Sequence, residues 1–116
     1  MENGNALYQK FKTSAQPAVR LELALQGFFC EDGFTDAQRR AFGDYLKLRI
    51  RPAAEVLIQR DALDKLQVLE AQGWMNGAVV EDCLNMAIRQ KKTQAFLWLL
   101  ELKTEKYGFR DRDFDL

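Results

Sequence analysis

The side chains that could perform catalysis in this chain are carboxylates, because its 116 residues include no histidine. Without His the chain lacks Ser-His and Cys-His nucleophilic pairs and imidazole acid–base catalysis. Glu81-Asp82 and Asp61 with Asp64 are carboxylate pairs that could transfer protons. Proteins of this size commonly contain such pairs, and no Gly-rich phosphate loop or Gly-x-Ser-x-Gly elbow accompanies them. We therefore expect no enzyme and no cofactor, with an enzyme or ligand-binding helical domain that uses carboxylate and Arg groups as the alternative.

Metal-binding and thiol chemistry have few candidate residues. Cys30 and Cys83 are the only cysteines, and two Cys without His do not complete a zinc site. We expect both to be reduced, buried thiols, with a disulfide between them as the alternative. Asp111, Asp113 and Asp115 alternate like calcium ligands, but the glycine and the distal glutamate of a calcium loop are missing. The sequence thus predicts a solvated tail and no metal site.

The overall charge gives no reason to expect a nucleic acid or a membrane as partner. Seventeen basic residues balance seventeen acidic ones, so the chain has no global field of one sign. The segment predicted as the third helix is basic, which favours a solvated helix face over a patch for phosphate or an acidic partner. Its basic residues are Arg39, Arg40, Lys47, Arg49 and Arg51. Residues 1–5 lack a signal-peptide pattern, and the longest apolar run, 95–100, is too short to cross a bilayer. A cytoplasmic location is expected.

Nearly every segment that could position these side chains reads as helix, because apolar residues recur at helical spacing and no strand-like alternation occurs. Pro17 suits the first turn of a second helix. Thr35 and Gln38 form a capping-box pattern that begins the third. Pro52 is expected to end or kink that helix, since proline disfavours helical geometry at Arg51.

The second half of the chain contains an apolar pattern that repeats after thirty residues. Residues 54–73 align with 84–103 without a gap, so that Ile58 falls opposite Ile88 and Leu69 opposite Leu99. This register predicts two helical hairpins, each a short helix followed by a second arm: 53–60 with 62–72, and 79–90 with 93–107. The residues expected to be mutually buried are Ile58, Leu66, Leu69, Ile88, Phe96 and Leu99.

Local signals should define the ends of these hairpins. Asp61 and Thr93 are the expected N-caps of the second arms. Gly73 suits a left-handed turn at the end of the first hairpin. Asn76-Gly77 marks a tight turn between the hairpins.

The second half resembles a pair of degenerate ankyrin repeats. Leu84-Asn85-Met86-Ala87-Ile88 matches the family's Leu-His-Leu-Ala-Ala helix, and Ala95-Phe96 followed by Leu99-Leu100 matches its second helix. Leu69, Gly73 and Asn76 match the end of a repeat, whereas Asp61 and Lys91 stand where the family has a glycine between its helices. The resemblance covers about residues 53–107.

The resemblance implies that a partner binds the exposed face of the short helices and the turn between hairpins. The matching positions are Glu55, Gln59, Trp74, Met75, Asn76, Asn85 and Arg89. Trp74 is suited to anchoring a partner, because Trp is enriched in interface hot spots. Its alternative role is to fold over the adjoining hairpin. Trp98, within the apolar second arm, is expected in the core.

These observations predict a single all-α domain spanning 1–116. Residues 5–51 would form N-terminal cap helices, 53–107 two stacked antiparallel hairpins of ankyrin-like or α-solenoid-like type, and 108–116 a C-terminal tail. Phe109 or Phe114 is expected to pack against the last hairpin. The predicted function is a non-enzymatic helical-repeat protein that binds another protein as an adaptor or subunit. A nucleic-acid-associated protein using the basic helix is a further alternative, and the sequence leaves the oligomeric state open.

Overall fold

The computed structural model describes residues 2–30 and 32–107, and in this part of the chain all regular structure is helical. The all-α prediction is therefore confirmed. The elements are α1 (Glu2–Thr13), α2 (Pro17–Phe29), α3 (Asp36–Leu48), α4 (Ile50–Gln59), α5 (Leu63–Ala71), α6 (Gly77–Arg89), α7 (Thr93–Leu102) and the π-helical turn η1 (Lys103–Tyr107). Contacts divide the chain into unit 1, Met1–Arg49, and unit 2, Ile50–Leu116. The boundary lies close to the predicted start of the hairpins, and the single domain stays a prediction.

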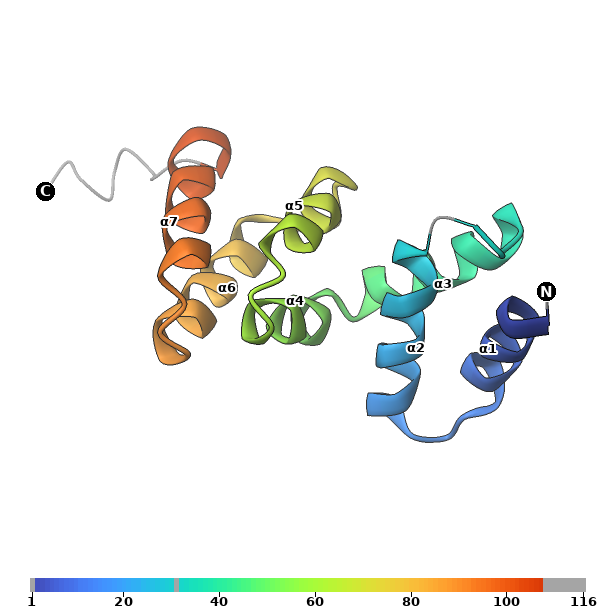
Figure 1. Cartoon of the computed structure of the whole chain (residues 1–116). Helices are drawn as coiled ribbons and strands as arrows, with labels where there is room; N and C mark the ends of the chain where they lie inside the picture. The colour runs from blue at the N-terminus through green and yellow to red at the C-terminus, as the bar shows by residue number, and fades with distance from the viewer. Residues whose placement is uncertain (1, 31, 108–116) are drawn as a thin grey trace, which may run out of the picture. The chain divides into compact units, whose positions relative to one another are not determined.

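Unit 1 is built around aromatic rings, with α2 packed against both α1 and α3 (Figure 1). The centroid of the Phe11 ring lies 5.0 Å from that of the Phe42 ring and 5.3 Å from that of the Tyr45 ring, and both pairs are arranged edge to face. Gly27 on α2 permits the close approach of α3, because a Cβ there would lie 2.2 Å from the Phe42 ring. Arg20 covers the Phe11 and Tyr45 rings and donates a hydrogen bond to the Phe11 carbonyl.

Two of the predicted helix starts are confirmed in unit 1, and the predicted effect of Pro52 in unit 2 is not. Pro17 opens α2, and the Thr35–Gln38 capping box begins α3 with both reciprocal hydrogen bonds. The third helix instead ends at Leu48, before Pro52 is reached. Pro52 lies in the first turn of α4, where its missing N–H has no intrahelical partner to lose, so Arg51 remains helical.

Unit 2 contains two helical hairpins, α4–α5 and α6–α7, with α4 packed beside α6 (Figure 1). Ile58, Leu66, Leu69 and Leu99 are buried as predicted. The prediction for Ile88 was wrong, since this side chain is 57% exposed whereas its counterpart Ile58 is 1% exposed.

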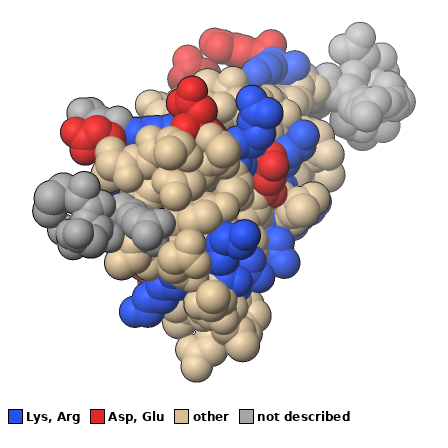
Figure 2. Space-filling view, turned by 90° about the vertical axis from the view of Figure 1, so that its right-hand side faces the viewer, with Lys and Arg blue, Asp and Glu red and all other residues tan. Residues whose placement is uncertain are grey.

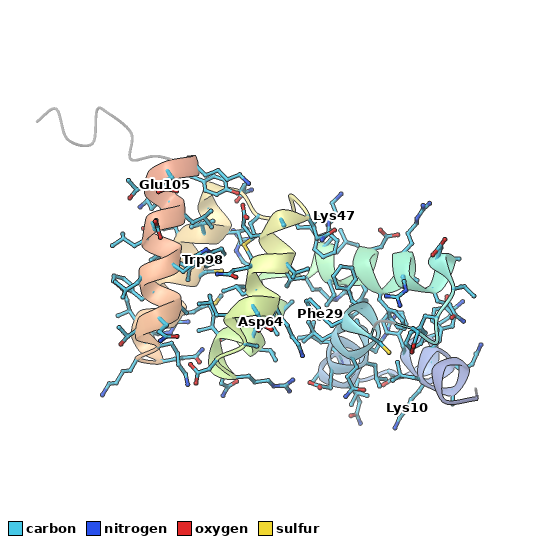
Figure 3. All side chains as sticks on the ribbon, turned by 45° about the horizontal axis from the view of Figure 1, so that its top comes forward. Lys10, Phe29, Lys47, Asp64, Trp98 and Glu105 are labelled. Carbon is cyan, nitrogen blue, oxygen red and sulfur yellow. The ribbon has the colours of Figure 1, made fainter. Side chains whose placement is uncertain are left out.

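Two aromatic residues of α7 are less buried than the sequence indicated. Phe96 and Trp98 are both half-buried rather than core residues. Trp98 projects from α7 in Figure 3. The fully buried positions of this helix are Ala95 and Leu99, which are four residues apart on one helix face.

The turns inside the two hairpins have the same backbone geometry thirty residues apart. Asp61 has φ 57° and Lys91 has φ 58°, the left-handed conformation in which glycine is the usual residue. In each turn the backbone N–H of the left-handed residue donates a hydrogen bond to the carbonyl three residues earlier. The N–H of the next residue donates one to the carbonyl five residues before it. These two hydrogen bonds together form a Schellman motif, which satisfies carbonyl groups at the end of the first helix of each hairpin.

The predicted N-caps of the second arms were wrong because this motif shifts the start of each helix. Ala62 and Lys92 are the N-cap residues of α5 and α7, and neither side chain forms a cap hydrogen bond. Asp61 belongs to the Schellman turn and Thr93 is the first helical residue. Gly73 has the predicted left-handed conformation, with φ 84°.

A small polar cluster joins the end of α7 to the first hairpin. Lys106 Nζ lies 2.6 Å from Glu70 Oε2, and the Tyr107 hydroxyl donates to the Met75 carbonyl at 2.9 Å. The Tyr107 oxygen also lies 3.4 Å from Glu70 Oε2. These contacts hold η1 against α5 and the following turn. The predicted packing of Phe109 or Phe114 lies outside the described residues.

Candidate partner-binding surface

Four predicted contact residues lie exposed on two neighbouring helices. Glu55 and Gln59 are four residues apart on α4, and Asn85 and Arg89 are four apart on α6. Such spacing places each pair on one face of its helix, and α4 packs beside α6. We call these four residues the outer face. It contains one acid, one base and two amides, which can donate and accept hydrogen bonds.

The predicted turn residues have structural roles that the sequence did not indicate. Met75 is only 5% exposed, and its carbonyl accepts the Tyr107 hydrogen bond, so its side chain is not offered to a partner in this conformation. Asn76 is exposed but acts as N-cap of α6, its side chain accepting from the Val79 amide. Trp74 is half-buried. Helix α6 begins at Gly77, directly after the cap, rather than at the predicted Val79.

The structure does not bring Trp74 together with Arg89, although the sequence placed them on one face. Trp74 lies just before the start of α6, and Arg89 is the last residue of this helix. Thirteen residues of α-helix separate its ends by about 18 Å at 1.5 Å per residue. A contact surface that includes both residues would therefore extend along the whole of α6.

Three of the four carboxylates considered for proton transfer, Asp61, Glu81 and Asp82, are engaged in separate ion pairs. Asp82 pairs with Arg51 of α4, which joins the two hairpins. Its neighbour Glu81 pairs with Lys103 of η1. Asp61 pairs with Lys92 at 2.9 Å, which joins the two hairpin turns. Adjacent acids thus point to different basic residues, an arrangement that links helices.

The two cysteines occupy different environments, and both are free. Cys83 is fully buried, and burial together with the neighbouring Asp82 raises the pKa of its thiol to about 12. A thiol with this pKa stays protonated near pH 7 and is a poor nucleophile. Cys30 is half-buried and its Sγ donates to the Asp32 carbonyl, so the prediction of two buried thiols is confirmed for Cys83 only.

Two grooves of unit 2 are lined in part by residues that correspond between the hairpins. The first, of about 290 Å³, is lined in the first hairpin by Leu57, Ile58, Asp61, Leu63 and Leu66, and is bordered by residues 91–95 of the second hairpin. The second, of about 200 Å³, is lined by Ala87, Ile88, Lys91, Lys92, Thr93 and Phe96. Adding thirty to the five positions of the first hairpin gives five of these six residues.

The apolar surface beside the second groove was not predicted from the sequence. Ile88 and Leu97 are more than half exposed, and Leu100 is also classed as exposed. On α7, Leu100 is four residues after Phe96 and three after Leu97, so both are its neighbours on the helix surface. The thirty-residue register was the available signal. The first hairpin is followed by a second one that packs beside it, whereas no further hairpin follows among the described residues.

The basic residues of α3 are partly engaged within unit 1. Arg49 lies over the Tyr45 ring at 4.0 Å, and Arg39 is half-buried. Arg40 and Lys47 are exposed, with the exposed acid Asp44 between them in sequence. On the face drawn in Figure 2, Lys and Arg side chains form separate groups, with Asp and Glu also present.

Two general features, a metal site and a membrane-spanning helix, are absent from residues 2–30 and 32–107. No group of three or more Cys, Asp or Glu side chains there is arranged to hold a metal ion. In the same residues no helix combines the length and apolar character needed to cross a membrane.

Comparison with known proteins gives no relative from which a function could be transferred. No protein-family model matches the chain, and no curated protein or solved structure is significantly similar to it. The outer face and the two grooves are therefore interpreted from their own geometry and chemistry.

Proposed function

We propose that this chain is a non-enzymatic helical-repeat protein that binds another protein, as an adaptor or as a subunit of a larger assembly. The observation that carries the proposal is the repeated hairpin geometry of unit 2, with matching Schellman turns at Asp61 and Lys91. Stacked helical repeats use their apolar positions to hold neighbouring units together. Their exposed positions are then available for recognition. The ankyrin-like or solenoid-like arrangement is part of this proposal.

The outer face is the proposed contact surface. All four of its residues, Glu55, Gln59, Asn85 and Arg89, are exposed. Arg89 supplies a guanidinium that can bind a carboxylate through two parallel hydrogen bonds. Asn85 and Gln59 supply amides that can pair with a partner's backbone or side chains. The half-buried Trp74 extends this surface at the opposite end of α6.

Two further observations bear on the non-enzymatic part of the proposal. Cys83 is buried and protonated, so it does not supply a thiolate. The first groove contains one carboxylate, Asp61, which is paired with Lys92. A second carboxylate that could act with it as an acid–base pair is not among the residues lining this groove.

The experiment is affinity purification of the tagged full chain from its native cell, with quantitative identification of the proteins retained. Two double variants are compared with the wild type. Asn85→Ala with Arg89→Ala removes half of the outer face. Gln67→Ala with Glu101→Ala is the matched control, because it also removes one amide and one charge from exposed positions, on α5 and α7.

A partner retained by the wild type and the control, but lost from the Asn85/Arg89 variant, supports the proposal. Circular dichroism and melting curves must show that both variants remain folded. If the folded Asn85/Arg89 variant retains the partner, the contact surface lies elsewhere on the protein. The absence of any protein enriched over an untagged control would contradict the function itself.

A further inference from the structure

The two grooves of unit 2 differ in what borders them. In the first groove, residues 91–95 lie against the first hairpin, and Lys92 forms an ion pair with Asp61. These residues are the turn and first helical residues of the second hairpin. In the second groove the equivalent apolar residue, Ile88, is 57% exposed. The first groove thus shows what kind of segment fits the second.

We infer that the second groove binds the first turn of a helix in a partner protein, with an apolar side chain against Ile88 and Phe96 and an acidic residue paired with Lys91. The apolar part follows from the correspondence of Ile58 with Ile88 and of Leu66 with Phe96. The first members of both pairs are buried, and they line the first groove together with residues 91–95 of the second hairpin. This inference rests on the proposed function, because it assigns a second contact surface to the same protein-binding chain.

The charge expected of the occupying segment follows from the opposite charges that the two hairpin turns carry. Asp61 occupies the turn of the first hairpin and accepts a basic partner, Lys92. Lys91 occupies the same turn position of the second hairpin with the same backbone conformation, and it is exposed. An acidic residue in the occupant therefore complements Lys91. Acidic side chains are also favoured in the first turn of a helix, because they interact well with the helix dipole.

The exposed apolar residues extend the surface along α7. Leu97 is 56% exposed, and Leu100 lies one helical turn further on. Thus the occupying helix has apolar surface to cover beyond its first turn. Ile88 is three residues after Asn85 on α6, so this surface adjoins the outer face. The two surfaces are tested through different residues, Ile88 and Lys91 for the groove and Asn85 and Arg89 for the outer face.

The test uses the full chain and two peptides derived from the segment that borders the first groove. The native peptide spans residues 90–103 with blocked ends, and the K92E peptide differs only by Lys92→Glu. Binding is measured by isothermal titration calorimetry at low salt. We expect the K92E peptide to bind the wild-type chain about fivefold more tightly than the native peptide, as one exposed ion pair allows.

Charge reversal in the protein sharpens the assignment. In a Lys91→Glu chain the preference should invert, so that the native peptide binds more tightly. Ile88→Ser should weaken both peptides by about tenfold, because apolar contact is lost. Leu48→Ser is the matched control at an exposed leucine of unit 1, and it should leave both affinities unchanged.

Three results would overturn the inference. The first is the absence of binding by either peptide, or equal binding that Lys91→Glu does not alter. The second is binding only after deletion of residues 108–116, which would assign the groove to this segment of the chain. The third is self-association of the wild-type chain in sedimentation experiments that Ile88→Ser abolishes, which would make a second copy the occupant. These results concern only Ile88 and Lys91. If the Asn85/Arg89 variant loses its partner in the affinity purification, that loss remains evidence for the proposed function.

Discussion

The two hairpins of unit 2 have the same turn and register but different burial at equivalent positions. Ile58 and Leu66 of the first hairpin are buried, whereas Ile88 is exposed and Phe96 is half-buried in the second. Leu69 and Leu99, by contrast, are both fully buried. The comparison separates two roles of apolar residues in a repeat. One set holds the two helices of a hairpin together, and the other covers the neighbouring hairpin.

The largest expected effect concerns the positions at which the hairpins are alike. Leu69→Ala and Leu99→Ala should each lower the free energy of unfolding by about 2–5 kcal/mol, because both leave a cavity at a fully buried leucine. Urea denaturation followed by circular dichroism measures this change. A loss below about 1 kcal/mol at either position would show that the two hairpins are not packed equivalently.

The next effect concerns the position at which they differ. Ile58→Ala should lower the free energy of unfolding by about 2–5 kcal/mol, since Ile58 is 1% exposed. Ile88→Ala should change it by only about 0.5 kcal/mol, because that side chain is mostly in solvent. The same denaturation experiment measures both. Equal losses would mean that something covers Ile88 in solution.

A smaller effect is expected at the two left-handed turn residues. Lys91→Gly should stabilise the protein by about 0.5–1 kcal/mol, because glycine adopts φ 58° without the cost that a Cβ imposes. Asp61→Gly should be close to neutral. Aspartate tolerates this conformation better than most residues, and its replacement removes the ion pair with Lys92. Thermal melts distinguish the two, and greater stabilisation by Asp61→Gly would contradict this account.

The smallest effect concerns the cluster that joins the end of α7 to the first hairpin. Glu70→Gln should lower the melting temperature modestly, by less than Leu99→Ala, because the partner Lys106 is largely in solvent. The hydrogen bond to Glu70 raises the pKa of Lys106, and burial raises the pKa of Tyr107. Both groups bind their protons more tightly in the folded protein than in the unfolded chain. Their contributions to the free energy of unfolding are therefore complete below pH 10 and are lost as the pH rises through the raised pKa values. The melting-temperature difference between wild type and variant should therefore shrink above pH 10.

The sequence alone predicted much of the helical architecture. Helical spacing predicted the α-helices of the described residues, and the Thr35–Gln38 pattern predicted a cap that forms. The thirty-residue register predicted two hairpins with Leu69 and Leu99 in their cores. These features depend on periodicity and on hydrogen bonds between residues close in sequence. Glu55, Gln59, Asn85 and Arg89 are exposed, as the resemblance implied, and the binding of a partner to them stays a prediction.

Only the tertiary structure decided which apolar residues are covered. Ile58 and Ile88 are the same residue in the same register, so no local pattern distinguishes them; the difference depends on whether another element packs on that face. Met75 likewise is buried, and its backbone carbonyl accepts a hydrogen bond from Tyr107, thirty-two residues later in the chain. The left-handed turns at Asp61 and Lys91 form without glycine, since the hydrogen bonds of the Schellman motif and the packing of the hairpin outweigh a local conformational cost of about 1 kcal/mol.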